Sequence, residues 1–310
     1  MSDQYQIIII PEDLTLIEKY APESLDILRS KGALIYEDLS RGFANIAFDN
    51  NKDIVLLLDP FVREYSWEEL NKILGKYKFK YIFTPYSRTA IDQEQCDNIG
   101  ICYSNNAGAN KNAVAQHCLE QMFMLLRQYN VVHRDNSGDV LGEEFEGKTV
   151  GIIGMGSIGK TLTKYLQMLG LNVFFYNRSE VKDPEFAGRQ KEFDEVMKQD
   201  IIFVTIATTP ETRKLFGDKF LAQLENKYLI DISSIDDLYS KETVIEFTQN
   251  GILKGYSFET DNPEKYPHAE RGNIQVTPHI AWLTTQALRN CYNGWLQMAI
   301  EVIENTSEKL

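Results

Sequence analysis

The sequence predicts an α/β protein that contains two doubly wound parallel sheets. Short runs rich in Ile, Val, Phe and Tyr alternate with longer amphipathic stretches, which is the pattern of strand–helix–strand units. The chain has 310 residues, of which 43% are hydrophobic, and this is enough for one large or two ordinary domains. Its apolar runs stay well short of the about 18 residues that a membrane-spanning helix needs. We therefore expect a soluble protein with a sizeable core.

The predicted strands are apolar runs bounded by polar or turn-forming residues. They lie at residues 6–10, 54–58, 80–83, 149–153, 172–176, 200–206, 227–232 and 253–258. Ser66 and Glu69 form a capping box, in which each side chain binds an otherwise unpaired backbone N–H and starts a helix. Residues 112–127 are apolar almost all round, which predicts a buried helix between domains. The polar, glycine-containing span 135–147 is the best candidate for a linker or arm.

Charge and cysteine content exclude several classes of partner. The net charge is −13, from 45 acidic and 32 basic residues, which argues against nucleic acid or an anionic membrane. The first six residues are polar and lack the features of a secretory signal, so we expect a cytoplasmic protein. Cys96, Cys102, Cys118 and Cys291 have no CxxC spacing, and we expect buried small side chains rather than a metal site or disulfides.

The strongest single motif is Gly154-Met155-Gly156-Ser157-Ile158-Gly159. It follows the predicted strand 149–153 and opens a predicted helix over residues 157–169, which is the context that a dinucleotide-binding loop requires. The first glycine permits a tight turn, the second lets the backbone approach a pyrophosphate, and the third lets helix and strand pack closely. The motif therefore predicts nucleotide binding.

The next strand ends in Tyr176-Asn177-Arg178-Ser179, where an acidic residue would favour the free 2′-hydroxyl of NAD. Asn177, Arg178 and Ser179 instead form a neutral and basic group that accepts a 2′-phosphate. This favours NADP(H) over NAD(H), with NAD(H) still possible. The alternative is that Arg178 only caps a solvated strand end.

Four segments, in order, resemble the D-2-hydroxyacid dehydrogenase family. Residues 105–127 resemble its hinge and long helix, and residues 146–154 resemble the start of its nucleotide domain. Residues 205–212, which read Thr-Ile-Ala-Thr-Thr-Pro-Glu-Thr, resemble its loop under the nicotinamide. Residues 274–281, which read Ile-Gln-Val-Thr-Pro-His-Ile-Ala, resemble the segment that carries its acid–base histidine. The resemblance covers nearly the whole chain. It implies a Rossmann NAD(P)-binding domain at 105–279, a flavodoxin-like substrate domain at 1–104 and 280–310, a helix at 284–303 that returns to the substrate domain, and a homodimer.

The resemblance also implies further residues that contact the cofactor. Glu259 matches an aspartate whose expected partner is the nicotinamide carboxamide, and this exchange preserves the charge. The other residues implied in this way are Ala207, Thr208, Thr212, Ile232, Ser233 and His279.

By position and resemblance His279 is the acid–base residue, because it follows Pro278 at a strand end. In the family a glutamate before a proline holds this imidazole. Here Asn262 takes that position, and Asp261 or Glu264 replaces it if the loop is shifted.

The other three histidines fit structural positions better. His117 lies inside the apolar helix and is more simply a packing residue. His133 and His268 lie in polar connecting segments.

The family's substrate-binding arginine is replaced in this chain. Ile230 and Asp231 stand where the family has Ile-Asn, and Ser234 falls at the arginine position. Serine offers one neutral donor where a guanidinium offers a charged, bidentate clamp for a carboxylate. We therefore count Ser234 as a catalytic position whose chemistry has changed.

Residues 84–89, Thr-Pro-Tyr-Ser-Arg-Thr, occupy the family's substrate-binding loop. Arg88 is a candidate replacement cation, with Tyr86 and Ser87 as neighbouring substrate-binding residues. The alternative is that Arg88 is an exposed residue at a helix start near Asp92.

Together these features predict an NADP-preferring oxidoreductase that passes a hydride between the nicotinamide and the carbonyl carbon of a 2-oxo acid or related ketone. A catalytically silent nucleotide-binding protein of the same fold is the alternative. Loss of the family's arginine and glutamate favours the silent protein, whereas His279 and the complete glycine loop favour the enzyme.

Overall fold

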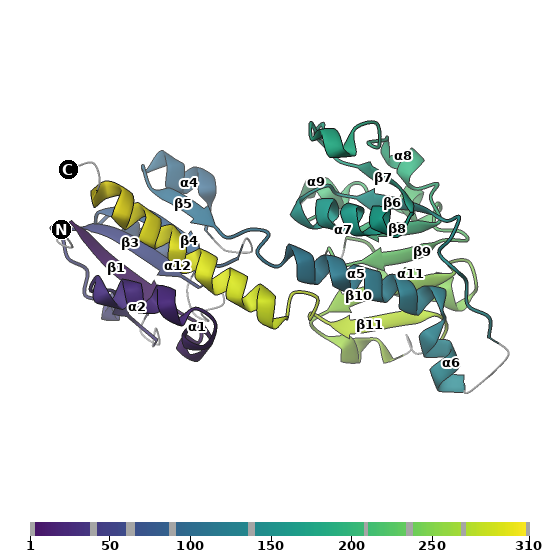
Figure 1. The fold of residues 1–310 in the computed structure, drawn as a ribbon, viewed down its shortest axis with the longest axis horizontal. Coiled ribbons are helices and arrows are strands. Elements are labelled where there is room, and N and C mark those ends of the chain that lie inside the picture. The colour runs from purple at the N-terminus through teal and green to yellow at the C-terminus, as the bar shows by residue number, and fades with distance from the viewer. Residues whose placement is uncertain are drawn as a thin grey trace. The chain divides into compact units, whose positions relative to one another are not determined.

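The computed structural model describes residues 4–37, 42–59, 66–86, 91–135, 140–207, 210–233, 238–267 and 271–307. The chain splits into two compact units, of which unit 1 is Met1–Asn110 with Thr284–Leu310 and unit 2 is Lys111–Leu283 (Figure 1). The sequence placed the divisions a few residues earlier, at 104/105 and 279/280.

Unit 1 contains a parallel sheet in the strand order β2-β1-β3-β4-β5, which is the flavodoxin-like order that was predicted. The strands are β1 (Tyr5–Ile10), β2 (Leu34–Ile35), β3 (Asp53–Leu58), β4 (Phe79–Thr84) and β5 (Cys102–Asn105). The apolar runs of β1 and β3 do not alternate with polar residues, because helices cover both faces of a sheet of this kind.

Helices pack on both faces of the unit 1 sheet. The helices of this unit are α1 (Leu14–Tyr20), α2 (Pro22–Ser30), α3 (Trp67–Leu74), α4 (Gln93–Asn98) and α12 (Thr285–Ser307), with a short 3-10 helix at Gly42–Asn45. The predicted capping box is confirmed, since Ser66 and Glu69 bind each other's backbone N–H at the start of α3. α12 packs on α1, α2, β3 and β4, and the indole N–H of Trp295 donates to the carbonyl of Phe83 at 2.9 Å.

Unit 2 contains a second parallel sheet, in the order β11-β10-β9-β8-β6-β7. The strands are β6 (Thr149–Ile153), β7 (Asn172–Tyr176), β8 (Ile201–Val204), β9 (Tyr228–Asp231), β10 (Gly255–Thr260) and β11 (Ile274–Pro278). Beyond β7, Gln190 forms a single parallel bridge with Phe175, where a longer Rossmann sheet has another strand. The strand order reverses at β6, so the crevice beside its carboxyl end is where such a sheet binds a ligand.

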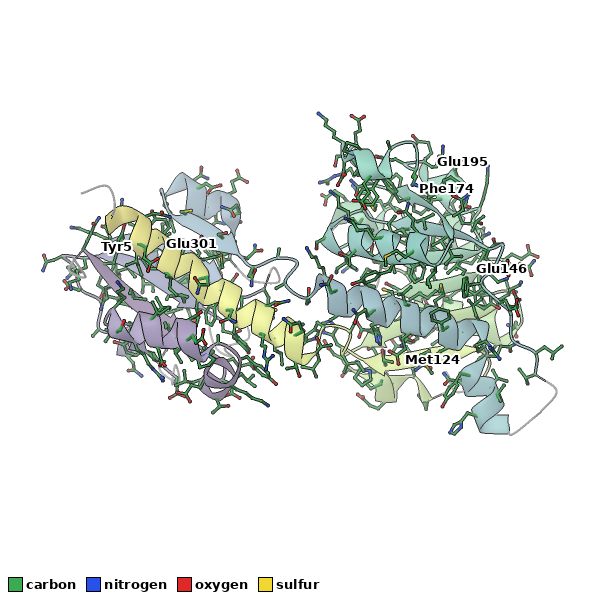
Figure 2. All side chains as sticks on the ribbon, viewed as in Figure 1. Tyr5, Met124, Glu146, Phe174, Glu195 and Glu301 are labelled. Atoms are coloured by element: carbon green, nitrogen blue, oxygen red, sulfur yellow. The ribbon has the colours of Figure 1, made fainter. Side chains whose placement is uncertain are left out.

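Two apolar cores lie on the two faces of this sheet. On one face α5 (Lys111–Leu126) and α7 (Ser157–Met168) pack on β6, β8 and β9. On the other face lie α8 (Phe193–Val196), α10 (Asp218–Leu221) and α11 (Lys241–Gln249). The remaining elements are α6 (Tyr129–Asp135), α9 (Pro210–Arg213) and the 3-10 helices Pro184–Phe186 and Pro263–Lys265. Figure 2 shows the side chains that fill these layers.

Some expectations from the sequence need correction. The strands β2 and β5 were not predicted, because β2 has two residues and β5 reads Cys-Tyr-Ser-Asn, a mixed polar run. Cys102 is exposed, unlike the other three cysteines. His133 lies on α6 and stacks on Tyr129, rather than in a connecting segment. Among the described residues, no helix is long and apolar enough to cross a membrane.

Candidate active site

The three glycines of the loop after β6 meet three different surroundings. Gly154 has a φ of 103°, and a Cβ there would lie 2.2 Å from Ile206 Cγ2, so only glycine fits. A Cβ on Gly159 would lie 2.2 Å from the Gly154 carbonyl oxygen, which shows how closely helix and strand pack. A Cβ on Gly156 would meet nothing within 4 Å. The loop therefore has the tight turn, the open backbone and the close contact that a bound pyrophosphate requires.

Gly156 is the N-cap of α7, and no side chain there binds the N–H groups of the first turn. These donors and the positive end of the helix dipole suit a phosphate. A surface pocket beside the loop is lined by Gly156, Ser157, Lys160 and Lys164. Lys160 lies 3.6 Å from Asp183 and Lys164 lies 2.8 Å from Glu185, so both cations also have acidic neighbours. The residues present fit a dinucleotide phosphate.

Asn177, at the end of β7, supports the glycine loop in a way that was not predicted. Its Oδ1 accepts a hydrogen bond from the Met155 N–H at 3.1 Å, and its Nδ2 donates to the Ser179 carbonyl at 2.9 Å. Gln190 donates to the carbonyls of Asn177 and Ser179. Arg178 and Ser179 are exposed. Asn177 thus couples the strand end to the loop, while Arg178 presents its side chain to solvent.

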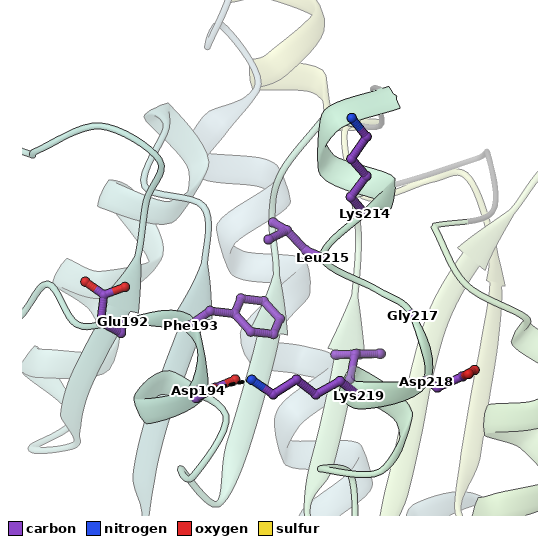
Figure 3. Close-up of a pocket in the computed structure, with 9 residues that line it drawn as sticks. Glu192, Phe193, Asp194, Lys214, Leu215, Gly217, Asp218 and Lys219 are labelled. Atoms are coloured by element: carbon purple, nitrogen blue, oxygen red, sulfur yellow. Dashed lines mark hydrogen bonds and ion pairs between the residues drawn. The ribbon is translucent and has the colours of Figure 1, made fainter.

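A second pocket of unit 2 lies between α8 and the segment that joins α9 to α10 (Figure 3). Phe193 points into this pocket, and Lys219 Nζ binds Asp194 Oδ2 at 2.5 Å across it. Phe193 also packs edge-on against Tyr176, the last residue of β7, with ring centroids 5.5 Å apart. The pocket is therefore connected by packing to β7, the strand that directly precedes Asn177.

Hydrogen bonds hold the loop after β8 at its start and just beyond its end. Thr205 Oγ1 donates to the Gly154 carbonyl at 2.8 Å, which ties this loop to the glycine loop. Thr212 Oγ1 donates to the Ala207 carbonyl at 2.9 Å. Thr208 lies outside the described residues.

Asp231, at the end of β9, is 3% exposed and accepts several hydrogen bonds. Its Oδ1 receives the N–H and the hydroxyl of Ser233, and its Oδ2 receives the Tyr239 hydroxyl at 2.7 Å. The carboxylate thereby fixes the backbone through Ile232 to Ser233. Ser234 lies outside the described residues.

His279 directly follows β11, and its Nδ1 lies 4.0 Å from Asp261 Oδ1. Asn262, the residue predicted to hold the imidazole, precedes the 3-10 helix Pro263–Lys265, and its backbone N–H donates to Thr260 Oγ1. The structure thus brings Asp261 to the imidazole, which was the alternative if the loop were shifted. Trp282 Nε1 donates to the His279 carbonyl at 3.1 Å.

Glu259, on β10, is 5% exposed and contacts the segment that follows His279. Its Oε1 accepts hydrogen bonds from the Ile280 N–H at 2.9 Å and the Ala281 N–H at 2.8 Å. Burial raises the pKa of Glu259 to about 7, and the nearby carboxylates of Asp231 and Asp261 act in the same direction, against the two N–H donors. Glu259 therefore acts on the backbone around His279, a role that the sequence did not predict.

A sequence model of the D-isomer specific 2-hydroxyacid dehydrogenase NAD-binding domain matches residues 117–281, more than half of the chain. The chain belongs to the D-isomer specific 2-hydroxyacid dehydrogenase family. It is 27% identical over 252 residues to a chloroplastic/mitochondrial formate dehydrogenase of Arabidopsis thaliana, covering 75% of this chain and 65% of that protein. It is 25% identical over 239 residues to D-lactate dehydrogenase of Lactobacillus delbrueckii subsp. bulgaricus, covering 69% of this chain and 72% of that protein.

Solved structures of the same fold cover nearly the whole chain. A glyoxylate reductase from Paecilomyes thermophila matches with a TM-score of 0.79 and 20% identity, over 97% of this chain and 96% of that chain. D-2-hydroxyisocaproate dehydrogenase matches with a TM-score of 0.75 and 19% identity, over 97% of each chain. The fold of two parallel-sheet units is therefore that of the family.

Within this family fold, unit 1 carries the predicted substrate-binding residues. Tyr86 follows β4, and its carbonyl accepts a hydrogen bond from Thr84 Oγ1. Burial raises the pKa of Tyr86, and so do the neighbouring side chain of Tyr292 and the thiol of Cys291. Ser87 and Arg88 lie outside the described residues. Among the described residues, no group of His, Cys, Asp and Glu side chains is arranged to hold a metal ion.

Proposed function

We propose that this family member is an NAD(P)-dependent oxidoreductase that transfers a hydride between the nicotinamide and the carbonyl or hydroxyl carbon of a 2-oxo or 2-hydroxy acid or a related ketone. One observation carries this proposal. All strands of the unit 2 sheet are parallel, so the glycine loop after β6 and His279 after β11 lie at the same edge of one sheet.

When bound, the nicotinamide supplies or accepts the hydride. The glycine loop and the first turn of α7 bind the pyrophosphate through backbone N–H groups. His279 donates a proton to the carbonyl oxygen during reduction and accepts it during oxidation. Because Asp261 lies on the Nδ1 side of the ring, we assign this proton to Nε2. The Asp261 carboxylate attracts the positive charge that the ring carries when it is protonated.

The end of β7 supports a preference for NADP(H), although NAD(H) also fits the loop. Asn177 carries no charge and is engaged with Met155, so no carboxylate from this residue repels a 2′-phosphate. Arg178 is exposed beside it. We propose that Arg178 and Ser179 bind the 2′-phosphate.

The curated relatives include D-lactate dehydrogenase, 4-methyl-2-oxopentanoate reductase A and glyoxylate reductase, which supports a small carbonyl acid as substrate. Unit 1 would serve as the substrate domain through Tyr86, Ser87 and Arg88. Because Ser234 replaces the family's arginine, we propose that Arg88 supplies the positive charge for a carboxylate. Removal of a donor from a developing oxyanion typically costs about 3 kcal/mol in the transition state. A homodimer and a cytoplasmic location stay predictions.

The test is a screen of 2-oxo acids and neutral ketones with NADH and NADPH, using wild type and His279→Ala. We expect reduction of at least one substrate by wild type. His279→Ala should bind NADPH with nearly unchanged affinity and lose the reduction, because a proton donor acts in the transition state. Wild-type kcat in His279→Ala would show that His279 is not the acid. Cofactor binding without turnover of any substrate would favour the silent nucleotide-binding protein.

Two further variants, Arg88→Ala and Ser234→Arg, test whether the substrate carries a carboxylate that Arg88 binds. If Arg88 replaces the clamp, Arg88→Ala should raise KM and lower kcat for the acid substrate while NADPH affinity stays the same. Ser234→Arg should improve turnover of glyoxylate or pyruvate. Wild-type kinetics in Arg88→Ala and no gain in Ser234→Arg would favour a neutral carbonyl substrate.

A further inference from the structure

A buried chain of polar side chains connects α5 to β10 inside unit 2. The Ser257 hydroxyl donates to Gln121 Oε1 at 2.7 Å, and Gln121 Nε2 lies 3.3 Å from His117 Nε2. His117 Nδ1 lies 3.2 Å from Glu120 Oε2. His117, Gln121 and Ser257 are almost fully buried. Unlike the motifs that match the family, this row of hydrogen-bonded side chains was not apparent from the sequence.

These contacts define the protonation of His117. Gln121 Oε1 accepts from Ser257, so Gln121 presents its NH₂ group to the ring, and His117 Nε2 must accept that hydrogen bond. Nδ1 then carries the proton and donates to Glu120. Burial also lowers the pKa of His117, against the effect of Glu120. His117 is therefore neutral at neutral pH.

Because His117 is neutral, it does not stabilise the negative charge of the nearby Glu259 carboxylate. His117 Nε2 lies 3.8 Å from Glu259 Oε1, and among the described residues it is the only Lys, Arg or His nitrogen within 4.0 Å of this carboxylate. Glu259 also interacts with the Cys118 thiol on α5, Asp231 on β9 and Asp261 after β10, and none of these three is a cation. The two N–H groups of Ile280 and Ala281 are thus the donors that the structure gives to Oε1.

We propose that Glu259 is a positioning residue for His279: its carboxylate holds the backbone turn that directly follows the imidazole, and the neutral His117 places no positive charge beside that carboxylate. The proposal rests on the proposed function, because it assigns Glu259 a role in the reaction of His279. It differs from a direct contact with the nicotinamide carboxamide, since the contacts of Oε1 are with the protein's own backbone.

The charge of Glu259 then affects how firmly the turn is held. An ionised carboxylate accepts stronger hydrogen bonds from N–H donors than a neutral carboxyl does. Because burial raises the pKa of Glu259 to about 7, the ionised fraction increases between about pH 6 and pH 8. The turn should be held more firmly at the upper end of this range, whatever substrate the enzyme uses.

Hydrogen exchange of the Ile280 and Ala281 amides tests this directly, in the full-length protein without cofactor or substrate. After correction for the intrinsic exchange rate, wild-type protection should rise several-fold from about pH 6 to pH 8. Glu259→Gln keeps an acceptor oxygen but no charge, so its protection should be lower at pH 8 and independent of pH. Glu259→Ala should reduce protection at least about tenfold at both pH values, which corresponds to about 1.4 kcal/mol.

Glu120→Gln is the matched control, because it removes an exposed carboxylate on the far side of His117 and keeps an acceptor for Nδ1. It should behave as wild type. Wild-type protection in both Glu259→Gln and Glu259→Ala would overturn the proposal. If Glu259→Ala does not fold, the amide protection of wild type is compared with that of Glu259→Gln at pH 8, and equal protection in the two proteins would overturn the proposal.

A kinetic readout connects the turn to the reaction. On a substrate from the screen, Glu259→Gln should lower kcat at pH 8 with little change in KM, and Glu259→Asp should restore part of the loss because it keeps the charge. An equal loss in Glu259→Gln and Glu259→Asp would overturn the role of charge. If no substrate is turned over, the proposed function fails, whereas the exchange experiment still decides whether Glu259 holds the turn.

Discussion

The buried carboxyl of Glu259 links the stability of the protein to pH. Burial raises its pKa from 4.5 to about 7, so between these values the folded state binds more protons than the unfolded state. The free energy of unfolding that this group contributes is fully present below about pH 4.5 and is lost as pH rises through about 7. A shift of this size corresponds to about 3 kcal/mol at most.

We therefore expect Glu259→Gln to gain stability relative to wild type as the pH is raised from 5 to 8, because the variant has no charge to bury. Urea unfolding of both proteins at these two pH values measures the difference. The opposing effect of His117, whose lowered pKa destabilises the folded state as pH falls, is present in both proteins and largely cancels. A constant difference between pH 5 and 8 would contradict the raised pKa.

The proposed preference for NADP(H) rests on Arg178, which is exposed just after β7. We expect NADPH to bind at least several-fold more tightly than NADH, and Arg178→Ala to remove this preference by weakening NADPH alone, since a guanidinium binds a phosphate through charged hydrogen bonds. Fluorescence titration of both cofactors measures this. Arg189, which donates to the Val173 carbonyl on the same strand, is a matched control. Equal affinities in wild type would show that the strand end does not distinguish the two cofactors.

At the scale of elements, the loop between β6 and α7 contains one glycine that we expect to matter for cofactor binding and another that matters for folding. A Cβ on Gly156 meets open space, and its φ of −74° suits any residue. A Cβ on Gly159 would clash with the Gly154 carbonyl. The two glycines therefore form a matched pair, one facing the predicted phosphate and one inside the helix–strand contact.

Gly156→Ala should leave the free energy of unfolding nearly unchanged and weaken NADPH binding at least about tenfold, because its methyl group occupies the space that the pyrophosphate approaches. Gly159→Ala should lower the free energy of unfolding by about 1–3 kcal/mol, the usual cost of overpacking. Thermal unfolding and cofactor titration of both variants measure these effects. Normal NADPH affinity in Gly156→Ala would place the phosphate elsewhere.

The elements that the sequence predicted are those with strong local signals. The runs 149–153 and 172–176 became β6 and β7, and the glycine motif opens α7 as expected. From the sequence, Asp261 was only an alternative neighbour of His279, because a match of residues to a family does not define how the loop after β10 is positioned. The contacts of Gln121 with Ser257 and of His117 with Glu259 were not predictable, since each joins residues more than 130 positions apart in the sequence. An apolar helix indicates burial, but it does not indicate which polar groups meet a buried histidine.

For the whole molecule, the two units differ in how the chain builds them. Unit 2 is one continuous segment, Lys111–Leu283, with an apolar core on each face of its sheet. Unit 1 is closed by the C-terminal segment, because α12 contributes the buried Trp295 and Asn106 donates to the carbonyls of Asn290 and Cys291. Removal of residues 284–310 would therefore expose the face of the unit 1 sheet that α12 covers, without cutting unit 2.

We expect a fragment of residues 111–283 to fold on its own and to bind NADPH, because the glycine loop, Asn177 and His279 all lie within it and both of its cores are complete. The complementary fragment 1–110 should not fold alone, since it lacks α12. Circular dichroism melting and fluorescence titration check both statements, with Gly156→Ala in the fragment as the control for specific binding. A fragment 111–283 that unfolds cooperatively but binds no dinucleotide would mean that unit 1 supplies essential contacts to the cofactor.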